Sequence, residues 1–317
     1  MPSIKGKNIL VTGGAGFIGS HLVDMLLYKG ANHVVVVDNF FLGKEENLNQ
    51  AKENIVIYRD DASDWGTMNA IIKNEKIEII YNLATIPLNY SFFNPYTAYM
   101  VNINLAETML KLLKEEAYKT LIHVSSSEAY GTALYSPMDE AHPLFPTTPY
   151  AAGKAAADLM IQSFYNIEPL DISIIRPFNN YGPRQNSVGN LAAIIPATVR
   201  YIKNGGKPII EGDGLQTRDF IYVGDTVRGL ILAYEKDESR HNVINLGTGK
   251  ELSIKDLINE ICQYYNYDGG TEWRAERPAD VKRLCACAKL AKSVLGFTPE
   301  IDFEQGLKMT LDWYENK

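Results

Sequence analysis

The sequence feature that most constrains the fold is a glycine cluster between two apolar runs near the start of the chain. Residues 9–12 are β-prone, glycines follow at positions 13, 14, 16 and 19, and a helical apolar pattern begins at Phe17. This order predicts a strand, a tight turn and a helix. Such glycines let the backbone approach a pyrophosphate, and the first N–H groups of the helix can bind it. The sequence therefore predicts a dinucleotide-binding turn whose contacts are Gly13, Gly16, Phe17, Ile18 and Gly19.

A run of valines supplies the second part of this motif. Residues 33–37 form an almost continuous β-branched run, which is typical of a parallel strand buried on both faces. The run ends at Asp38, 19 residues after Gly19, and Asn39 follows. A carboxylate at this point binds the adenosine ribose and repels a 2′-phosphate, so the sequence favours NAD over NADP. The alternative is a glycine turn in another α/β protein that binds no dinucleotide.

Length and charge exclude several classes of partner. The chain has 317 residues, a net charge of −7 and no run of Lys or Arg, which argues against nucleic acid. No apolar stretch is long enough for a membrane span and no signal-like segment is visible, so we expect a cytoplasmic protein. Three cysteines, at 262, 285 and 287, cannot build a disulfide framework, and no nearby residues complete a metal site.

Strand and helix signals alternate through the first half of the chain. The alternation predicts an α/β fold with a doubly wound parallel sheet. We expect a Rossmann domain over residues 1–178, to which 216–246 return, and a smaller, mostly helical substrate lobe over 179–317. The expected strands are 34–38, 55–58, 79–83, 120–125 and 172–176, with short returning strands at 219–223 and 243–245, and the expected helices include 96–116.

A tyrosine and a lysine occur at helical spacing in the middle of the chain. Tyr150 and Lys154 are four residues apart, which places them on one face of a helix. Free tyrosine titrates near pH ~10, and a neighbouring cation lowers that pKa, so Tyr150 becomes a usable base. Ser126 follows a predicted strand, where it either binds a substrate hydroxyl or caps the next turn. Glu128 is either a second acid or base or a solvated turn residue.

These residues together carry a family resemblance. The glycine turn, Asp38, Ser126, Tyr150 and Lys154 occur in the same order as in the extended short-chain dehydrogenase/reductase superfamily. The motifs at 176–184, at 212–220 and at 295–297 extend the likeness over nearly the whole length. Within that superfamily the chain resembles the nucleotide-sugar epimerases, dehydratases and decarboxylases, among them UDP-glucose 4-epimerase.

The resemblance implies roles for further residues. It implies NAD as cofactor, a UDP-sugar as the favoured substrate and a homodimer built through a four-helix bundle. Ser126, Glu128, Tyr150 and Lys154 would be catalytic. The further cofactor contacts would be Asp61, Ala62, Leu83, Ala84, Asn102 and Pro177. The substrate contacts would be Ser127, Asn179, Asn190 and Leu191, with Arg218 and Arg283 as clamps on the diphosphate.

The reaction is narrowed by departures from the family pattern. Glu211 stands where relatives often carry an aromatic residue against the base, and simple epimerases usually lack an acid at the Glu128 position. We expect a UDP-sugar 4-epimerase that acts through a 4-keto intermediate. The alternatives are a nucleotide-sugar 4,6-dehydratase and a UDP-glucuronate-type decarboxylase, either of which would use Glu128. A non-catalytic NAD-binding regulator would not need Ser126, Tyr150 and Lys154.

Overall fold

The centre of the molecule is a seven-stranded sheet in which every neighbouring pair is parallel. The structure is a computed structural model that describes residues 2–317. The strand order is β11-β6-β5-β4-β1-β2-β3, which is the expected doubly wound Rossmann arrangement. The strands are β1 (Asn8–Thr12), β2 (His33–Val37), β3 (Ile55–Tyr58), β4 (Ile79–Asn82), β5 (Thr120–Val124), β6 (Ile172–Pro177) and β11 (Val243–Leu246).

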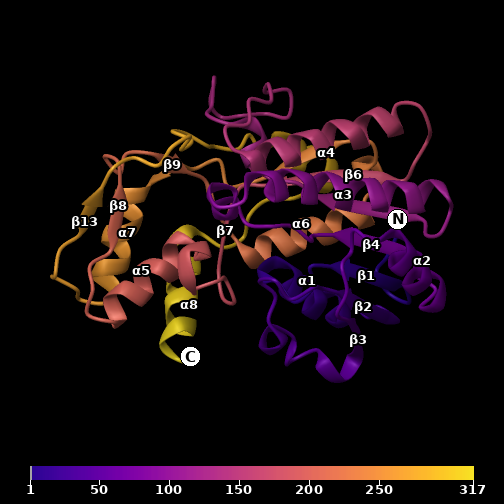
Figure 1. The fold of residues 1–317 in the computed structure, drawn as a ribbon, viewed down its shortest axis with the longest axis horizontal. Helices are drawn as coiled ribbons and strands as arrows, with labels where there is room; N and C mark the ends of the chain where they lie inside the picture. Colours follow the sequence, from indigo (N-terminus) through magenta and orange to yellow (C-terminus); the bar gives the residue numbers. More distant parts are fainter. Residues whose placement is uncertain (1) are drawn as a thin grey trace.

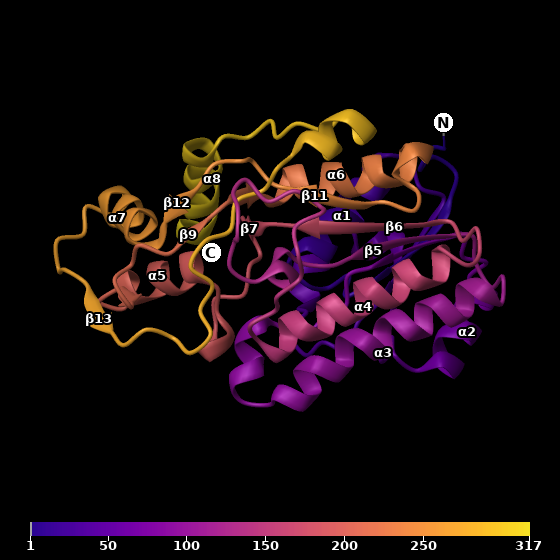
Figure 2. The same ribbon diagram turned by 90° about the horizontal axis from the view of Figure 1, so that it is seen from above.

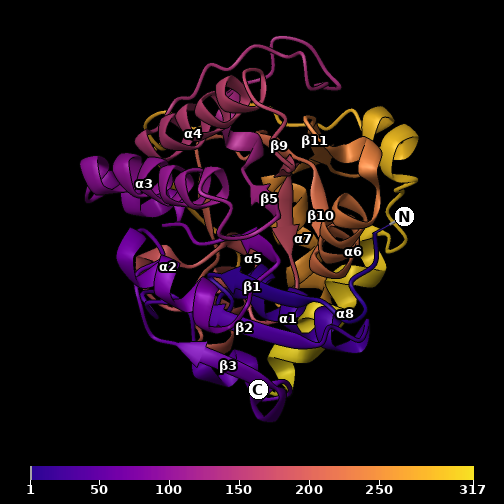
Figure 3. The same cartoon turned by 90° about the vertical axis from the view of Figure 1, so that its right-hand side faces the viewer.

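Helices cover both faces of this sheet, because successive strand residues point to opposite sides. Val34 and Val36 pack with helices α1 (Phe17–Tyr28) and α6 (Val223–Glu235), whereas Val35 and Val37 pack on the other side. That second layer consists of α2 (Trp65–Asn74), α3 (Pro95–Lys114) and α4 (Pro149–Tyr165). Figure 3 shows the two layers on either side of the strands, and α3 and α4 lie side by side in Figure 2. The strands are thus buried on both faces, as their valine-rich sequence predicts.

A smaller lobe extends from one end of the sheet, on the left in Figure 1. Its core joins helices α5 (Ile194–Lys203), α7 (Ile254–Tyr264) and α8 (Phe303–Glu315). Short strands complete it in pairs, namely β7 (Asn179–Tyr181) with β10 (Phe220–Tyr222), β8 (Ile209–Glu211) with β13 (Glu272–Arg274), and β9 (Thr217–Arg218) with β12 (Leu252–Ser253). Because these strands have only two or three residues each, the lobe is mostly helical, as expected.

The chain crosses between the two parts differently from the sequence prediction. The strand expected at 219–223 does not return to the large sheet, because Phe220–Tyr222 pairs with β7 instead. Of residues 216–246, strand β11 and helix α6 do return. Near the end of the chain, Ala291, Leu295 and Phe297 pack into the core under α1 and α6 rather than into the lobe. Short apolar runs do not reveal which of two cores will bury them.

Among residues 2–317, no helix has both the length and the apolar composition that crossing a bilayer requires.

The turn between β1 and α1 is packed too tightly for side chains. A Cβ added at Gly19 would lie 2.2 Å from the carbonyl oxygen of Gly13, and one added at Gly13 would lie 2.9 Å from Cα of Ala84. Gly13 also has a φ of +67°, which L side chains rarely adopt. The first helix can therefore approach the sheet only because these positions are glycines.

We expect Gly19→Ala to destabilise the protein by about 1–3 kcal/mol, because the new methyl group has to displace backbone. Urea denaturation measures the change. Gly66→Ala is a matched control, because a Cβ there would meet nothing closer than 3.6 Å. Equal stabilities of the two variants would contradict the close packing of α1 on β1.

Candidate active site

The glycine turn is shaped to receive a phosphate group. Gly16 is the N-cap of α1 and makes no side-chain capping bond, and no acidic residue stands in the first turn of the helix. The first N–H groups of α1 are therefore available to an anion at the positive end of the helix dipole. Phe17 and Ile18 open this helix. The cradle left by missing side chains fits the predicted dinucleotide pyrophosphate.

Asp38 lies at the end of β2 directly beside this turn. Its Oδ2 accepts a hydrogen bond from the N–H of Ala15 at 2.9 Å, and its Oδ1 accepts one from the N–H of Phe40 at 2.8 Å. Only 7% of the residue is exposed, and burial raises the pKa of the carboxyl. Asn39 forms the next turn by accepting the N–H of Phe41 at 3.0 Å. The carboxylate of Asp38 thus fixes the backbone of the glycine turn, and it lies where the adenosine ribose of the dinucleotide is expected.

The other predicted cofactor residues lie close to the same edge of the sheet. Leu83 and Ala84 follow β4, and their N–H groups both bind Oγ1 of Thr12 at 3.1 Å. Asn102, on α3, is buried and accepts the hydroxyl of Thr85 at 2.8 Å. The remaining three are also at or just beyond strand ends, Asp61 and Ala62 after β3 and Pro177 at the end of β6. Ligands of open α/β sheets bind at this carboxyl edge.

Tyr150 and Lys154 lie one turn apart near the start of α4. The helix begins well because Pro149 occupies its first position and Thr148 caps the N–H of Ala151. The side chains of Ser126 and Thr85 lie near the hydroxyl of Tyr150, and both act to lower its pKa. The ammonium of Lys154 donates to the carbonyl oxygen of Val124 at 2.9 Å. The predicted trio of Ser126, Tyr150 and Lys154 is therefore brought together at the end of β5.

The pKa of the Tyr150 hydroxyl is not lowered as the sequence argument expected. Burial raises it to about 12, although the hydrogen bond from Ser126 opposes the shift. Burial likewise lowers the pKa of Lys154 to about 8. The expectation was wrong because it considered the neighbouring cation and omitted desolvation, which acts on both groups.

A buried carboxylate on α4 fixes the helix to the strands. Oδ2 of Asp158 accepts Oγ of Ser125 at 2.8 Å and Nε of Arg176 at 2.7 Å. Asp158 and Arg176 are 0% and 2% exposed. Since Ser125 follows β5 and Arg176 belongs to β6, this one group holds α4 in register with both strands.

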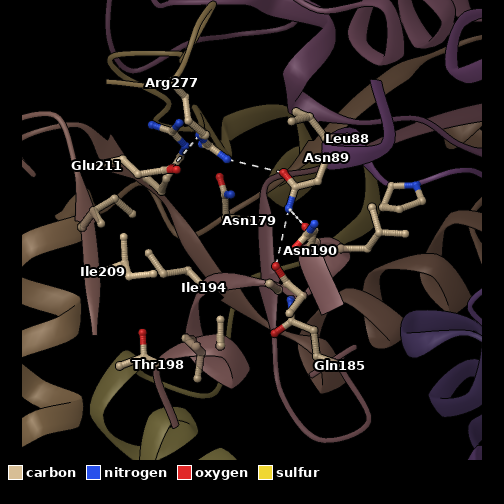
Figure 4. A pocket seen from close by; sticks show the side chains of 18 of the residues that line it. Leu88, Asn89, Asn179, Gln185, Asn190, Ile194, Thr198, Ile209, Glu211 and Arg277 are labelled. Atoms are coloured by element: carbon tan, nitrogen blue, oxygen red, sulfur yellow. Dashed lines mark hydrogen bonds and ion pairs between the residues drawn. The ribbon is translucent and has the colours of Figure 1, made fainter. Parts of the chain in front are cut away.

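A pocket of about 600 Å³ opens between the sheet edge and the lobe (Figure 4). Ser126, Glu128 and Tyr150 line its catalytic end. The predicted substrate residues Asn179, Asn190, Leu191 and Arg218 also line it, as does Glu211. The side-chain oxygens of Asn179 and Gln185 are buried and have no hydrogen-bond partner within residues 2–317. Such groups point to a polar ligand that supplies the missing partners.

Two arginines share one buried carboxylate in this pocket. Oδ1 of Asp280 lies 3.1 Å from Nη2 of Arg218 and 2.8 Å from Nη2 of Arg277. Burial raises the pKa of Glu128, while the charges of these two arginines oppose the shift. Paired guanidinium groups suit the oxygens of a diphosphate.

Two predicted substrate residues are not brought to the pocket. The side chain of Arg283 is 54% exposed and paired with Glu251 at 2.6 Å. Arg277 lines the pocket in its place, and the sequence analysis missed it. The available signal was its spacing of three residues from Asp280, a carboxylate that can orient it. Ser127 lies in the short helix 127–130, is 3% exposed and does not line the pocket, whereas its neighbours Ser126 and Glu128 do.

Comparisons with known proteins agree with this geometry. The family model described as GDP-mannose 4,6 dehydratase matches residues 10–310. The chain belongs to this family. Its extended short-chain dehydrogenase/reductase character is thereby confirmed, and so is the expectation that it is an enzyme of the epimerase and dehydratase class.

Relatives with different reactions are similarly close. A putative UDP-glucose 4-epimerase of Methanocaldococcus jannaschii is 33% identical over 97% of this chain and 98% of its own length. A dTDP-D-glucose 4,6-dehydratase of Mus musculus is 30% identical over 99% of this chain and 90% of its own. The solved UDP-N-acetylglucosamine 4-epimerase of Methanobrevibacter ruminantium, in complex with UDP-N-acetylmuramic acid, is 36% identical with a TM-score of 0.90, and the match covers 98% of this chain and 99% of that one. Relatives named as epimerases and as dehydratases therefore match both the epimerase prediction and its dehydratase alternative.

The lowered pKa of Lys154 gives stability a definite pH dependence. The folded chain releases this proton near pH 8, whereas the unfolded chain keeps it to about pH 10.5, so the unfolded state binds more protons in between. Stability that this group costs at neutral pH is therefore regained as the pH rises through that window. Relative to Lys154→Met, the wild type should gain up to about 2 kcal/mol between about pH 7.5 and pH 9.5 in urea denaturation.

Lys119→Met serves as the control, since the side chain of Lys119 is 77% exposed. Its stability should follow the wild type across the same range. A wild-type curve parallel to that of Lys154→Met would contradict a lowered pKa at Lys154.

Proposed function

We propose that the chain is an NAD-dependent nucleotide-sugar epimerase that inverts C4 of a UDP-sugar through a 4-keto intermediate. The observation that carries the proposal is the position of the Tyr150 hydroxyl. It lies near Ser126 at one end of a pocket whose other groups include the arginine pair. A sugar held by its diphosphate on Arg218 and Arg277 can then reach Tyr150.

The cofactor site at the carboxyl edge of the sheet supports NAD. The glycine turn, the start of α1 and Asp38 would hold the dinucleotide, with Leu83 and Ala84 beside it. The dTDP-glucose 4,6-dehydratase DesIV of Streptomyces venezuelae, 28% identical with a TM-score of 0.92, was solved with NAD bound. NAD supplies reversible hydride transfer and, in its oxidised form, a positive charge.

The chain's own residues supply proton transfer and positioning. Tyr150 takes the proton of the sugar 4-hydroxyl while the hydride leaves C4, and Ser126 hydrogen-bonds the same oxygen. Lys154 holds a positive charge behind the tyrosine. The phenolate becomes accessible when positive charge in the loaded site offsets the burial that raises the pKa of Tyr150 to about 12. Inversion requires the keto sugar to present its other face before the proton and hydride return.

Glu128 favours a second candidate, a nucleotide-sugar 4,6-dehydratase. Its carboxyl lines the pocket near Tyr150, and its negative charge contributes to the raised pKa of that phenol. Burial raises the pKa of Glu128 itself, which suits a group that exchanges a proton with substrate. After oxidation at C4, such a group could remove the C5 proton as the C6 hydroxyl leaves. A UDP-glucuronate-type decarboxylase would instead release the C6 carboxylate as carbon dioxide.

Incubation with UDP-glucose, UDP-N-acetylglucosamine and UDP-glucuronate, followed by NMR and mass analysis, separates these reactions. We expect a product of unchanged mass inverted at C4. Loss of water would instead support the dehydratase, and loss of carbon dioxide the decarboxylase.

Tyr150→Phe should abolish all three reactions, whereas Glu128→Gln should leave most epimerase activity and remove nearly all dehydratase activity. Absence of any product from all three sugars would contradict the proposal.

We also propose that the active form is a homodimer built on the outer faces of α3 and α4. These helices lie side by side on one face of the sheet (Figure 2). Several of their large apolar side chains are exposed. On α3, Tyr96, Tyr99 and Met100 are 84%, 37% and 45% exposed at helical spacing, and Leu159 on α4 is 56% exposed. Exposed apolar residues on two paired helices suit a symmetric helical interface.

The double variant Met100→Glu and Leu159→Glu should be monomeric in light scattering coupled to size-exclusion chromatography, because two charges would enter an apolar interface. Ile167→Glu is the control, as this 81% exposed residue lies beyond the end of α4. A monomeric wild type would refute the proposal.

We place the enzyme in the cytoplasm. The three cysteines are all free in the folded chain, which suits a reducing compartment.

A further inference from the structure

Glu211 stands within reach of the arginine pair without a role in the chemistry described so far. Its Oε2 lies 3.0 Å from Nε of Arg277, and the two side chains are 37% and 33% exposed (Figure 4). We propose that Glu211 competes with the substrate diphosphate for Arg277 and thereby sets the affinity and selectivity of the pocket for diphosphate ligands. This inference rests on the proposed function of the pocket.

The contacts of Arg277 divide into a fixed set and a movable one. Asp280, 5% exposed, binds both Arg277 and Arg218, so it holds the two guanidinium groups at a constant spacing. Asn89 adds a weak bond at 3.4 Å. Glu211 instead lines the open pocket at the end of a three-residue strand, and only its flexible side chain carries the charge. Departure of Glu211 would therefore leave Arg277 in place.

The geometry of the Glu211 pair is incomplete. The carboxylate is within ion-pair distance of Nε, but Nε of Arg277 is buried and has no hydrogen-bond partner within the part of the chain that the structure describes. A buried guanidinium N–H without an acceptor is costly to leave unpaired. A phosphate oxygen of the ligand can accept the hydrogen bond from Nε of Arg277, which Glu211 does not accept in this geometry.

Charge explains why the two occupants compete. In the ligand-free pocket, the carboxylates of Glu211 and Asp280 balance the two arginines. A diphosphate brings further negative charge to the same guanidinium, so it is repelled by a carboxylate that remains nearby. Removing the charge of Glu211 should therefore strengthen binding of any ligand that uses Arg277. A ligand without phosphate should be unaffected.

Titration calorimetry of the full chain with UDP and with uridine tests this inference. For a partly exposed ion pair, Glu211→Gln should lower the Kd for UDP by about two- to five-fold and leave binding of uridine unchanged. The KM for the nucleotide sugar should fall by the same factor with kcat unchanged, because the lost competition acts on ground state and transition state alike. Glu211→Ala should act in the same direction. Arg277→Gln should weaken UDP binding.

Glu276→Gln is the matched control. Glu276 is a nearby exposed carboxylate that pairs with Lys282 and does not line the pocket, so its removal should not change the Kd for UDP. Unchanged or weaker UDP binding by both Glu211 variants would overturn the inference while leaving the proposed function intact. An equal gain in Glu276→Gln would also overturn it, because the effect would then be one of general charge. A wild type that binds none of UDP, dTDP and GDP would overturn the proposed function together with the inference.

Discussion

The arrangement of the catalytic side chains depends on the buried carboxylate of Asp158, which does not line the pocket. Asp158 is fully buried on α4 and is bound by Ser125 after β5 and by Arg176 in β6. A buried ion pair is a weak source of net stability, but its geometry is demanding, because an unpaired charge at that position would cost several kcal/mol. The pair therefore specifies one seating of α4 on the sheet, and that seating places the Tyr150 hydroxyl against Ser126.

The pocket is formed by two separate parts of the chain. The turn at Gly13–Gly19 and the helix carrying Tyr150 belong to the sheet, whereas Arg218 and Arg277 belong to loops and short strands that join the lobe. The two parts are bound together by chain crossings, since β11 and α6 return to the sheet after β10 has paired in the lobe. In the proposed reaction, substrate groups held by the lobe would thus meet a proton acceptor held by the sheet.

Much of this could be predicted from the sequence, and the failures share a physical origin. The glycine turn, the valine strand with Asp38 and the spacing of Tyr150 and Lys154 are local patterns whose geometry follows from backbone sterics and helical period. Local spacing pairs Arg277 with Asp280, but it does not show whether Arg277 or Arg283 faces the pocket. Which of them faces the pocket depends on Asp280 and Glu251, and those contacts exist only in the folded chain. The destination of 219–223 and the pKa of Tyr150 were missed for the same reason, since pairing partners and desolvation are tertiary properties.

Desolvation shifts the pKa values of three groups at the catalytic end of the pocket in the direction that favours their neutral forms. Burial raises the pKa of Tyr150 and of Glu128 and lowers that of Lys154, so each of the three shifts favours the neutral form. Each shift is opposed by charges or hydrogen-bonding groups nearby, but desolvation is the largest cause in all three. A positive cofactor ring would favour the phenolate, and a diphosphate on the arginines would offset the positive charges that oppose the shift at Glu128. In the proposed reaction, cofactor and substrate would together set the protonation states of these groups, on a framework that Asp158 and Asp280 hold in place.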